Sequence, residues 1–353
     1  MNGQIRFAVR LPHTWCIADT DSIVQVVDLA EELGFWGVSV QDHLLSDSSV
    51  SPCGSAHAGD DRNVFELLQV LAFTAGRTDR IKLVAGVVVL PFHDPILLAK
   101  ELATLDVLSR GRLIAGVGVG ALVGRKEDSG QRLEGHRQIA VKEFEVLKIS
   151  GNRGPVVDES IQAMTALWTQ DRASFHGATV SFDDLEMYPK PVQKPRPPIL
   201  IGGRSAAAER RVALLADGWF PSQATAAGLE AGRGRIEAMA QEAGRPTDGF
   251  DWGVNIFAAV DRSDGDARQA MRDSLGRRFE GDEPLFAATI AGDAAAFAQR
   301  VDEYAAAGCG FLDLKFVPLT LADTLDQMRF VMREVAPRVE DLAAARLAHR
   351  KEA

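Results

Sequence analysis

The chain has 353 residues, of which 46% are apolar and 25% charged, and its formal net charge is −10. This is the composition of an ordinary globular protein, and the length suits one large domain or two ordinary ones. The acidic balance argues against non-specific nucleic-acid binding, which needs clustered cations, and no apolar run approaches the 18 or so residues of a membrane span.

Apolar, β-branched runs alternate along the chain with segments of helical period. In chain order, the first half predicts strand Ile5–Arg10, helix Asp21–Leu33, strand Gly37–Val40, helix Val64–Ala75, strand Ile81–Leu90, helix Pro95–Leu108, strand Arg112–Val119, helix Asp158–Trp168 and a small hairpin over Ala173–Phe182. The second half predicts strand Ile199–Ile201, a helix ending at Ala216, strand Gly218–Phe220, helix Leu229–Ala243, strand Trp252–Val260, helices Asp264–Arg278 and Asp293–Ala307, strand Phe311–Val317 and helix Leu321–Val335.

Eight strands followed by helices in one continuous run favour a (β/α)₈ barrel (a TIM barrel) over a doubly wound sheet. No linker marks a second domain, so residues 1–353 are expected to form a single barrel. Residues 121–154 lack clear periodicity, and this stretch and the loop 279–292 are predicted to be insertions or lids.

The N-terminal stretch Met1–Arg10 lacks the basic segment, apolar run and cleavage site of a signal peptide. Cys16, Cys53 and Cys309 are widely spaced and fit no disulfide or zinc pattern. Both features predict a cytoplasmic protein with reduced thiols.

The reactive groups of such a barrel gather at the carboxyl ends of its strands. Asp42 and His43, the two predicted catalytic residues, follow the second predicted strand. A histidine here could donate a proton or hydrogen-bond a cofactor ring, because its ordinary pKa lies near working pH. The alternative is that His43 merely caps the strand end and pairs with Asp42.

Glycines lie at the carboxyl ends of two other predicted strands. Gly202 and Gly203, with Arg204 and Ser205, lead into a helix, where close backbone approach, amide groups and a guanidinium suit a phosphate; an ordinary turn with Ser205 as the helix cap is the alternative. Gly116, Gly118 and Gly120 are not a GxGxxG fingerprint, and they either let a flat ligand lie against the strand end or ease packing.

Several patterns are missing. The sequence has no HxH after the first strand, no His/Asp/Glu cluster of metal-ligand spacing, no G-x-S-x-G elbow and no P-loop, so no metal is expected. His93 precedes Asp94 and Pro95, which form a helix start, and this structural role is sufficient to explain it. Lys315 is interpreted as a packing or strand-end residue, and His13 is given no role. A site this poor in titratable groups usually leaves the chemistry to a cofactor.

Five segments, taken together and in this order, resemble the luciferase-like, flavin-utilising oxidoreductases. They are Val38–Leu45, Gly86–Pro95, Leu98–Gly120, Tyr188–Gly203 and Ala216–Phe220. The resemblance implies a barrel with an insertion after strand four, a reduced flavin or coenzyme F420 at the strand ends, and often a homodimer. The sequence is most similar to the probable F420-dependent subgroup.

The resemblance also implies roles for individual residues. His43 would lie by the reactive ring, and a bulged non-prolyl cis peptide between Val87 and Val88 would back it. The other matched residues are Gly118 and Gly120 in the cofactor wall, and Gly202, Gly203, Arg204 and Ser205 in the phosphate loop. Some relatives carry a glutamate where this chain has Ala121, which argues against chemistry that relies on that acid. Arg125, Lys126 and Arg204 are the cations that could bind the polyglutamate tail of coenzyme F420.

Three functions follow. The first is hydride transfer between bound F420 and a small organic substrate, with His43 as proton donor or ring-orienting partner. The second is an FMN-dependent monooxygenase that uses reduced flavin and O₂, and the third a non-catalytic flavin-binding barrel. The substrate would be selected by residues 46–62 and by the two insertions, whose shapes no motif fixes.

Overall fold

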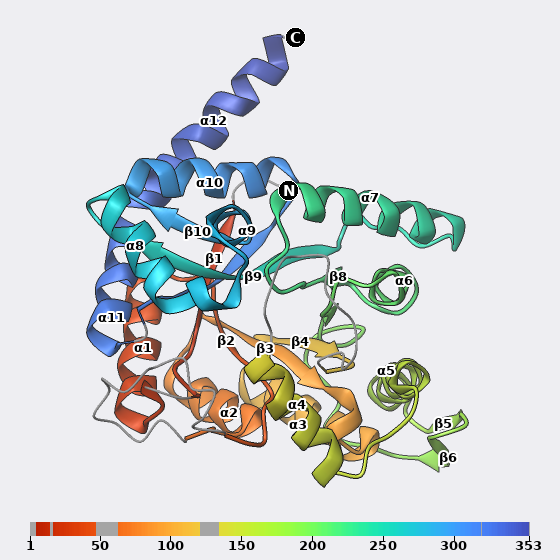
Figure 1. Cartoon of the computed structure of the whole chain (residues 1–353). Helices are drawn as coiled ribbons and strands as arrows, with labels where there is room; N and C mark the ends of the chain where they lie inside the picture. The colour runs from red at the N-terminus through yellow and green to blue at the C-terminus, as the bar shows by residue number, and fades with distance from the viewer. Residues whose placement is uncertain (1–4, 15–16, 47–62, 121–133, 319, 353) are drawn as a thin grey trace.

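The computed structural model describes residues 5–14, 17–46, 63–120, 134–318 and 320–352, and it confirms the predicted barrel. Parallel strands close into a ring in the order β1-β2-β3-β4-β7-β8-β9-β11, because β11 pairs back onto β1 (Figure 1). Their bounds are β1 Arg6–Arg10, β2 Gly37–Val40, β3 Lys82–Val89, β4 Leu113–Gly118, β7 Ile199–Ile201, β8 Gly218–Trp219, β9 Asp251–Val260 and β11 Phe311–Phe316.

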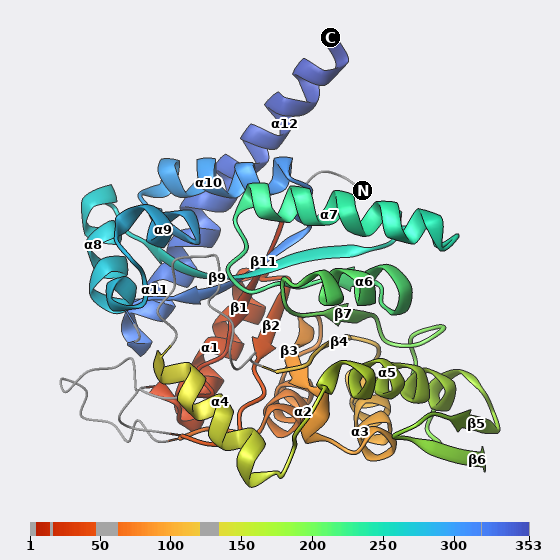
Figure 2. The same cartoon turned by 45° about the vertical axis from the view of Figure 1, so that its right-hand side comes forward.

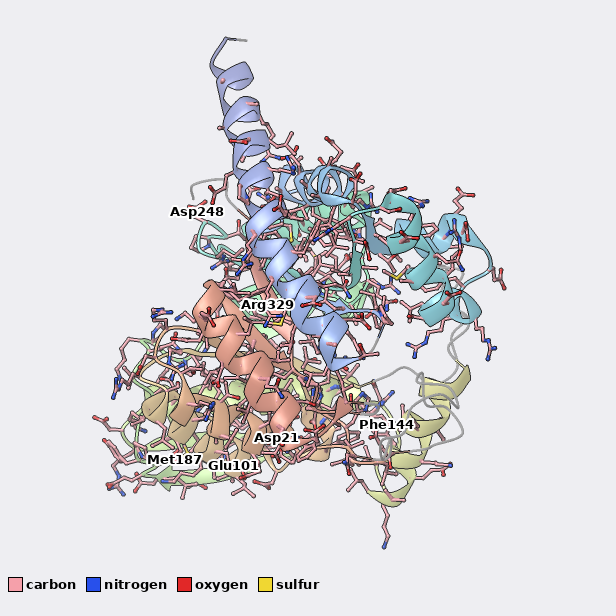
Figure 3. All side chains as sticks on the ribbon, turned by 90° about the vertical axis from the view of Figure 1, so that its left-hand side faces the viewer. Asp21, Glu101, Phe144, Met187, Asp248 and Arg329 are labelled. Carbon is pink, nitrogen blue, oxygen red and sulfur yellow. The ribbon has the colours of Figure 1, made fainter. Side chains whose placement is uncertain are left out.

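Helices pack around this ring (Figures 1 and 2). They are α1 Thr20–Leu33, α2 Leu67–Arg77, α3 Pro95–Leu108, α4 Glu134–Val146, α5 Arg153–Thr169, α6 Ala206–Leu215, α7 Ala226–Glu242, α8 Asp264–Leu275, α9 Asp282–Ala287, α10 Ala294–Ala306, α11 Leu321–Phe330 and α12 Ala336–Glu352. Of these, α4 lies against the carboxyl end of β4 and α12 projects away from the barrel. Two short 3₁₀ helices are η3 Leu90–Phe92 and η4 Gly276–Arg278, and η5 Val331–Val335 is a short π-helix. Figure 3 shows α11 alongside α1, and Figure 2 shows α12 projecting beyond α10. Within the described ranges no helix has the length and apolarity to cross a bilayer.

Three regions differ from the sequence prediction, and the first is the C-terminal one, where α12 follows the last predicted helix. Residues 279–292, expected to lack regular structure, contain α9 and a short strand, β10 Thr289–Gly292, which extends the sheet along β9 beyond β8. The four residues of β10 include Ala and Gly and carry no strand pattern in the sequence. Only their pairing with the edge of β9 identifies them as a strand. The region 121–154 contains α4 and the start of α5, while residues 121–133 lie outside the described part of the chain. The predicted hairpin is present as β5 Ala173–His176 and β6 Ser181–Leu185.

The barrel interior contains a buried polar layer. Nη2 of Arg10 lies 2.9 Å from Oδ2 of Asp313, a carboxylate that also accepts hydrogen bonds from Ser39 Oγ (2.7 Å) and Asn255 Nδ2 (2.6 Å). These groups come from β1, β11, β2 and β9, so the layer joins four strands. A charge buried this deeply is tolerated because it is paired and hydrogen-bonded on every side. Below it lies an apolar layer that includes Val84, Ile114, Leu200, Phe220 and Phe311.

The segment that best resembles the luciferase-like proteins, around Leu98–Gly120, is largely architectural. The buried guanidinium of Arg112 donates to the carbonyls of Ala75, Thr78 and Ile81, and so satisfies the carboxyl end of α2. Asp106 accepts from the backbone and side-chain amides of Gln193 and thereby fixes the proline-rich segment that precedes β7.

The predicted position of the cis peptide is wrong by one residue. The non-prolyl cis bond joins Gly86 to Val87, and the register between β3 and β4 shifts between Ala85 and Val88. The irregularity in β3 is therefore present, but the uniform run of small and β-branched residues gives no signal that separates one peptide bond from the next.

Candidate active site

The carboxylate of Asp42 holds the ends of β2 and β3 together. Its Oδ2 accepts hydrogen bonds from the backbone amide of Val89 and from Nε2 of His93, both at 2.8 Å. Burial opposes a charge on His93, but the hydrogen bond and charge of Asp42 outweigh it and raise the pKa of His93 above its ordinary value. Sequence reasoning assigned His93 to a helix start alone and missed this pair. The contacts give Asp42 a positioning role, whereas its predicted catalytic role stays a prediction.

His43 pairs with Glu143 and not with Asp42. Its Nδ1 lies 3.5 Å from Oε1 of Glu143, which reaches across from α4. The same oxygen accepts the backbone amides of Leu44 (2.7 Å) and Leu45 (3.2 Å), so a single carboxylate fixes the loop and the imidazole together. Burial raises the pKa of Glu143, but the contact with His43 and the hydrogen bonds from the two amides outweigh it and lower this pKa overall. Glu143 lies within the predicted insertion and was not identified from the sequence.

A second histidine, His13, stands at the end of β1 and is completely buried. Its Nε2 accepts the backbone amide of Gln41 at 3.0 Å, so its Nδ1–H donates to the carbonyl of Leu11 at 2.8 Å. Burial, and next the charge of Arg10, lower the pKa of His13 to about 3. His13 is therefore a neutral hydrogen-bond bridge between β1 and β2.

Val87, Gly118 and Gly202 form one wall of the mouth, named here the glycine wall. The bulge in β3 turns Val87 toward the ends of β4 and β7, and a Cβ added at Gly118 or at Gly202 would lie 3.2 Å from its methyl groups. Glycine at both positions leaves this face shallow. The chain therefore offers a flat, apolar surface on which a planar ring could lie.

Two other predicted wall residues have packing explanations. Val88 is buried and pairs with Val117 of β4, on the face toward the helices. A Cβ at Gly120 would lie 2.6 Å from Cζ of Phe144, and the residue has φ +74°, so the packing of α4 alone accounts for glycine there. Direct cofactor contacts from Val88 and Gly120 stay predictions.

The predicted phosphate loop follows β7 and opens α6. Gly203 has φ +91°, and its carbonyl accepts the indole N–H of Trp219 at 2.8 Å. Ser205 Oγ accepts the amide of Ala208 at 3.2 Å, which is the capping role considered from the sequence, and Arg204 Nη1 donates to the carbonyl of Gln223. The loop is thus built as a turn into a helix amino end, where an anion is favoured.

The opposite side of the mouth carries cations that the sequence did not reveal. Lys315 of β11 and Arg278 of η4 both face the ring of Phe257 on β9, with Nζ at 5.2 Å and Cζ at 5.8 Å from its centroid. Burial, followed by the charges of Arg10 and Arg278, lowers the pKa of Lys315, and burial lowers that of Arg278 to about 10. A single lysine in an apolar strand, and an arginine after a helix, carry no signal that they converge.

The described ranges contain no group of three His, Cys, Asp or Glu residues placed to hold a metal. Cys309 is buried, and burial raises the pKa of its thiol to about 12, so it is a neutral thiol near pH 7. Cys16 and Cys53 lie outside the described residues.

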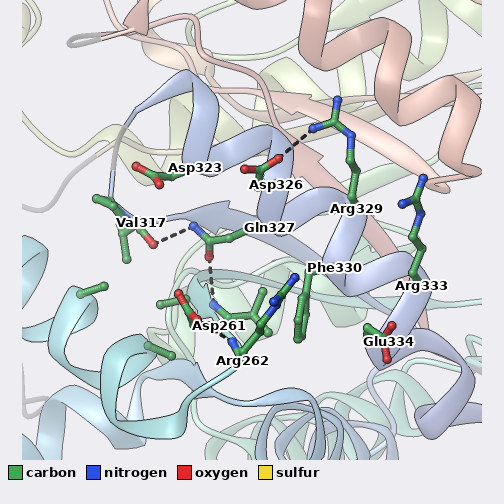
Figure 4. Close-up of a pocket in the computed structure, with 15 residues that line it drawn as sticks. Asp261, Arg262, Val317, Asp323, Asp326, Gln327, Arg329, Phe330, Arg333 and Glu334 are labelled. Carbon is green, nitrogen blue, oxygen red and sulfur yellow. Dashed lines mark hydrogen bonds and ion pairs between the residues drawn. The ribbon is translucent and has the colours of Figure 1, made fainter.

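A separate cavity of about 550 Å³ opens outside the barrel, beside α11 and the ends of β9 and β11 (Figure 4). Gln327 spans it, because its amide accepts from the backbone of Val260 and donates to the carbonyl of Val317. Acidic and basic side chains alternate along its rim, as with Asp326 and Arg329. None of the predicted site residues lines it, so the strand ends remain the candidate site.

Comparison with known proteins identifies the family to which this barrel and its strand-end residues belong. The family model described as luciferase-like monooxygenase matches residues 6–310. The chain belongs to the luciferase-like monooxygenase family.

Two known proteins are similar to this chain in sequence. An uncharacterized protein of Mycobacterium tuberculosis is 35% identical over 201 residues, which cover 54% of this chain and 64% of the relative. An FMNH₂-dependent dimethylsulfone monooxygenase of Pseudomonas putida is 30% identical over 259 residues, which cover 73% of this chain and 63% of that protein. The chain thus spans less than two thirds of the length of both.

Among solved structures, a coenzyme F420-dependent tetrahydromethanopterin reductase from Methanopyrus kandleri superposes with a TM-score of 0.73. It is 18% identical, and the match covers 95% of this chain and 99% of that one. At this identity the likeness concerns the fold.

Proposed function

We propose that this luciferase-like protein is an oxidoreductase that binds coenzyme F420 at the mouth of its barrel and transfers a hydride to or from a small organic substrate. The observation that carries the proposal is the glycine wall, where Val87 faces Gly118 and Gly202 and a Cβ at either glycine would fill the space. A flat, apolar face of this kind suits a tricyclic ring. The resemblance of the strand-two and strand-three endings to the F420-dependent subgroup favours the deazaflavin.

The chain's own groups would divide the work. Gly202, Gly203 and Arg204, at the amino end of α6, would hold the coenzyme phosphate. His43, held by Glu143, would donate a proton or orient the ring, and Asp42 would hold the two strand ends in register. The bound coenzyme would supply the carbon that gives or takes the hydride, while the protein supplies orientation and a dry pocket.

A second candidate is an FMN-dependent monooxygenase. It is favoured by the sequence identity to the FMNH₂-dependent dimethylsulfone monooxygenase, which extends over 73% of this chain. The residues named above would serve either coenzyme. The two candidates differ in their use of oxygen, which a reduced flavin activates and a deazaflavin does not appreciably.

The test is a fluorescence titration of the purified protein with F420 and, separately, with oxidised and reduced FMN. Tight binding of F420 alone would support hydride transfer. Tight binding of FMN, followed by substrate-dependent oxygen uptake, would support the monooxygenase. Binding of neither coenzyme would overturn both candidates. If a coenzyme binds and turns over, His43→Ala should lower the rate and not the affinity alone; a change in affinity alone would favour a non-catalytic flavin-binding barrel.

We further propose that the protein acts in the cytoplasm as a homodimer on a small-molecule substrate. Light scattering coupled to size-exclusion chromatography would give the mass in solution. A mass near that of one chain would exclude the dimer.

A further inference from the structure

We infer that the β9–β11 side of the mouth binds the anionic group of the substrate, a small organic carboxylate or sulfonate held between Lys315 and Arg278. This inference deepens the proposed function, because it presumes that the barrel mouth is where a substrate meets the coenzyme. The argument rests on the position of these two cations, on the charges around them and on what lies across the mouth.

The strand register places Lys315 in the layer above the buried polar layer. Asp313 pairs with Asn255, and two residues further along each strand Lys315 pairs with Phe257. Residues two apart on a strand share a face, so Lys315 and Phe257 point into the barrel, one step nearer the mouth than the Asp313 layer. Arg278 approaches the same Phe257 ring from η4.

Among the described residues, two of the three charged groups that act on Lys315 are cations. Arg10 and Arg278 repel Lys315, and the carboxylate that attracts it is Asp313, which already accepts from Arg10, Ser39 and Asn255. His13, the neighbouring titratable group on β1, is neutral. An anion placed beside Lys315 and Arg278 would offset part of the cost of burying these two cations.

The cations lie away from the predicted phosphate loop. Around the ring, β11 and β7 are separated by β8 and β9 on one side and by β1 to β4 on the other. Gly202 to Ser205 therefore bound one side of the mouth, and Lys315 and Arg278 the other. Lys315 and Arg278 are half-buried, so part of each side chain remains accessible to a ligand. This separation assigns the cations to the substrate and leaves the coenzyme phosphate to the loop.

The neighbourhood also limits the rest of the ligand. Next to the cations stands an apolar cluster formed by Phe257, Ala259, Phe279, Ala288 and Val317, with others behind them. A guanidinium and an ammonium together suit the oxygens of a carboxylate or a sulfonate, and the buried apolar cluster beside them disfavours further polar groups on the ligand. The structure thus favours an organic acid over a neutral ketone, alcohol or sulfone.

The test compares ligands that differ in charge alone. Isothermal titration calorimetry would measure hexanoate against hexanamide, and butane-1-sulfonate against butyl methyl sulfone, on the protein with and without the coenzyme that it is found to bind. We expect each anion to bind at least about tenfold more tightly than its neutral partner, as for hydrogen bonds to charged groups. Equal affinities in the wild type, with coenzyme bound, would overturn the inference and leave the proposed function standing.

Variants then locate the effect. Lys315→Met and Arg278→Met should each remove the preference for the anion and leave the coenzyme dissociation constant within about twofold. Arg277→Met is the matched control, because Arg277 is exposed on the same turn and should keep the preference. A loss of coenzyme affinity of about tenfold in both Met variants would overturn the inference, because the cations would then serve the coenzyme phosphate. If neither F420 nor FMN binds the wild type, the proposed function is contradicted. The preference for the anion can still be measured on the coenzyme-free protein, so failure of the inference and failure of the proposed function are distinguishable.

Discussion

The carboxylate of Glu143 lies 3.5 Å from Nδ1 of His43 and at the same time accepts the backbone amides of Leu44 and Leu45. A residue of α4 thus sets the position of the imidazole that follows β2. The contact links the segment after β4, where sequence reasoning placed a lid, to the centre of the proposed chemistry.

Glu143→Gln should therefore lower kcat by roughly tenfold or more, as expected for a displaced acid–base group. The neutral amide still offers one oxygen to the loop but loses the charge that holds the imidazole. Steady-state kinetics and a coenzyme titration would separate the rate from binding, and the coenzyme affinity should change little. Glu145→Gln, an exposed neighbour on α4, is the control. Equal kcat values for the two variants would refute the positioning role of Glu143.

Two glycines of β4 should respond differently to a methyl group. At Gly116 an added Cβ would overlap the backbone carbonyl oxygen of Ala85, which cannot move without breaking the β3–β4 pairing. At Gly118 the nearest atom is a methyl of Val87, at 3.2 Å. Gly116→Ala should cost at least about 1–3 kcal/mol of unfolding free energy in a urea titration.

Gly118→Ala should cost less stability than Gly116→Ala and should instead weaken coenzyme binding, because its methyl group would stand on the glycine wall. Fluorescence titration of both variants measures this directly. If Gly118→Ala binds F420 and FMN as the wild type does, Gly118 does not face the coenzyme.

The sequence predicts those parts of this protein that depend on local patterns. Runs such as Gly37–Val40 and Ile199–Ile201 were bounded correctly, because a strand buried on both faces is rich in apolar, β-branched residues and lies between turn residues. The start of α3 followed from Asp94 and Pro95, and Asp94 does accept the amides of Ile96 and Leu97.

Contacts between distant segments could not be predicted in this way. Glu143 is 100 residues from His43 in sequence, and Lys315 and Arg278 meet only across the ring of Phe257. Each of these side chains is ordinary in its own segment. Long-range pairing through the closed barrel is what brings them together, and one sequence contains no record of it.

The Asp42–His93 pair predicts a specific pH dependence of stability. The pKa of His93 is raised above its ordinary value of 6.5, so the folded chain binds this proton more tightly than the unfolded chain. The stabilisation is therefore complete below that ordinary value and is lost as pH rises through the raised pKa. The difference in unfolding free energy between the wild type and His93→Gln should be larger at about pH 5 than at about pH 9. A difference that grows toward high pH would mean that Asp42 does not favour the protonated imidazole.

The buried pair of Arg10 and Asp313 gives the most demanding test of how the barrel interior is stabilised. Asp313→Leu leaves the guanidinium of Arg10 buried without its carboxylate and also removes the acceptor of Ser39 and Asn255. The expected loss is about 3–5 kcal/mol in a denaturant titration, the usual result of breaking a buried pair from one side. Arg10→Met alone should be similarly costly, because it isolates the carboxylate.

The double variant distinguishes the stabilisation that the ion pair itself provides from the free-energy cost of leaving one buried charge unpaired. In the variant Arg10→Met/Asp313→Leu no ion is left unpaired, so much of the lost stability should return, as happens when buried ion pairs are replaced by apolar residues. Full recovery of the unfolding free energy would mean that the ion pair does not stabilise the fold and instead positions groups at the barrel mouth, since Asp313 also acts on Lys315. The catalytic rate of the double variant would then fall although its stability does not. Strict additivity of the two losses would show that Arg10 and Asp313 act independently, against the 2.9 Å contact between them.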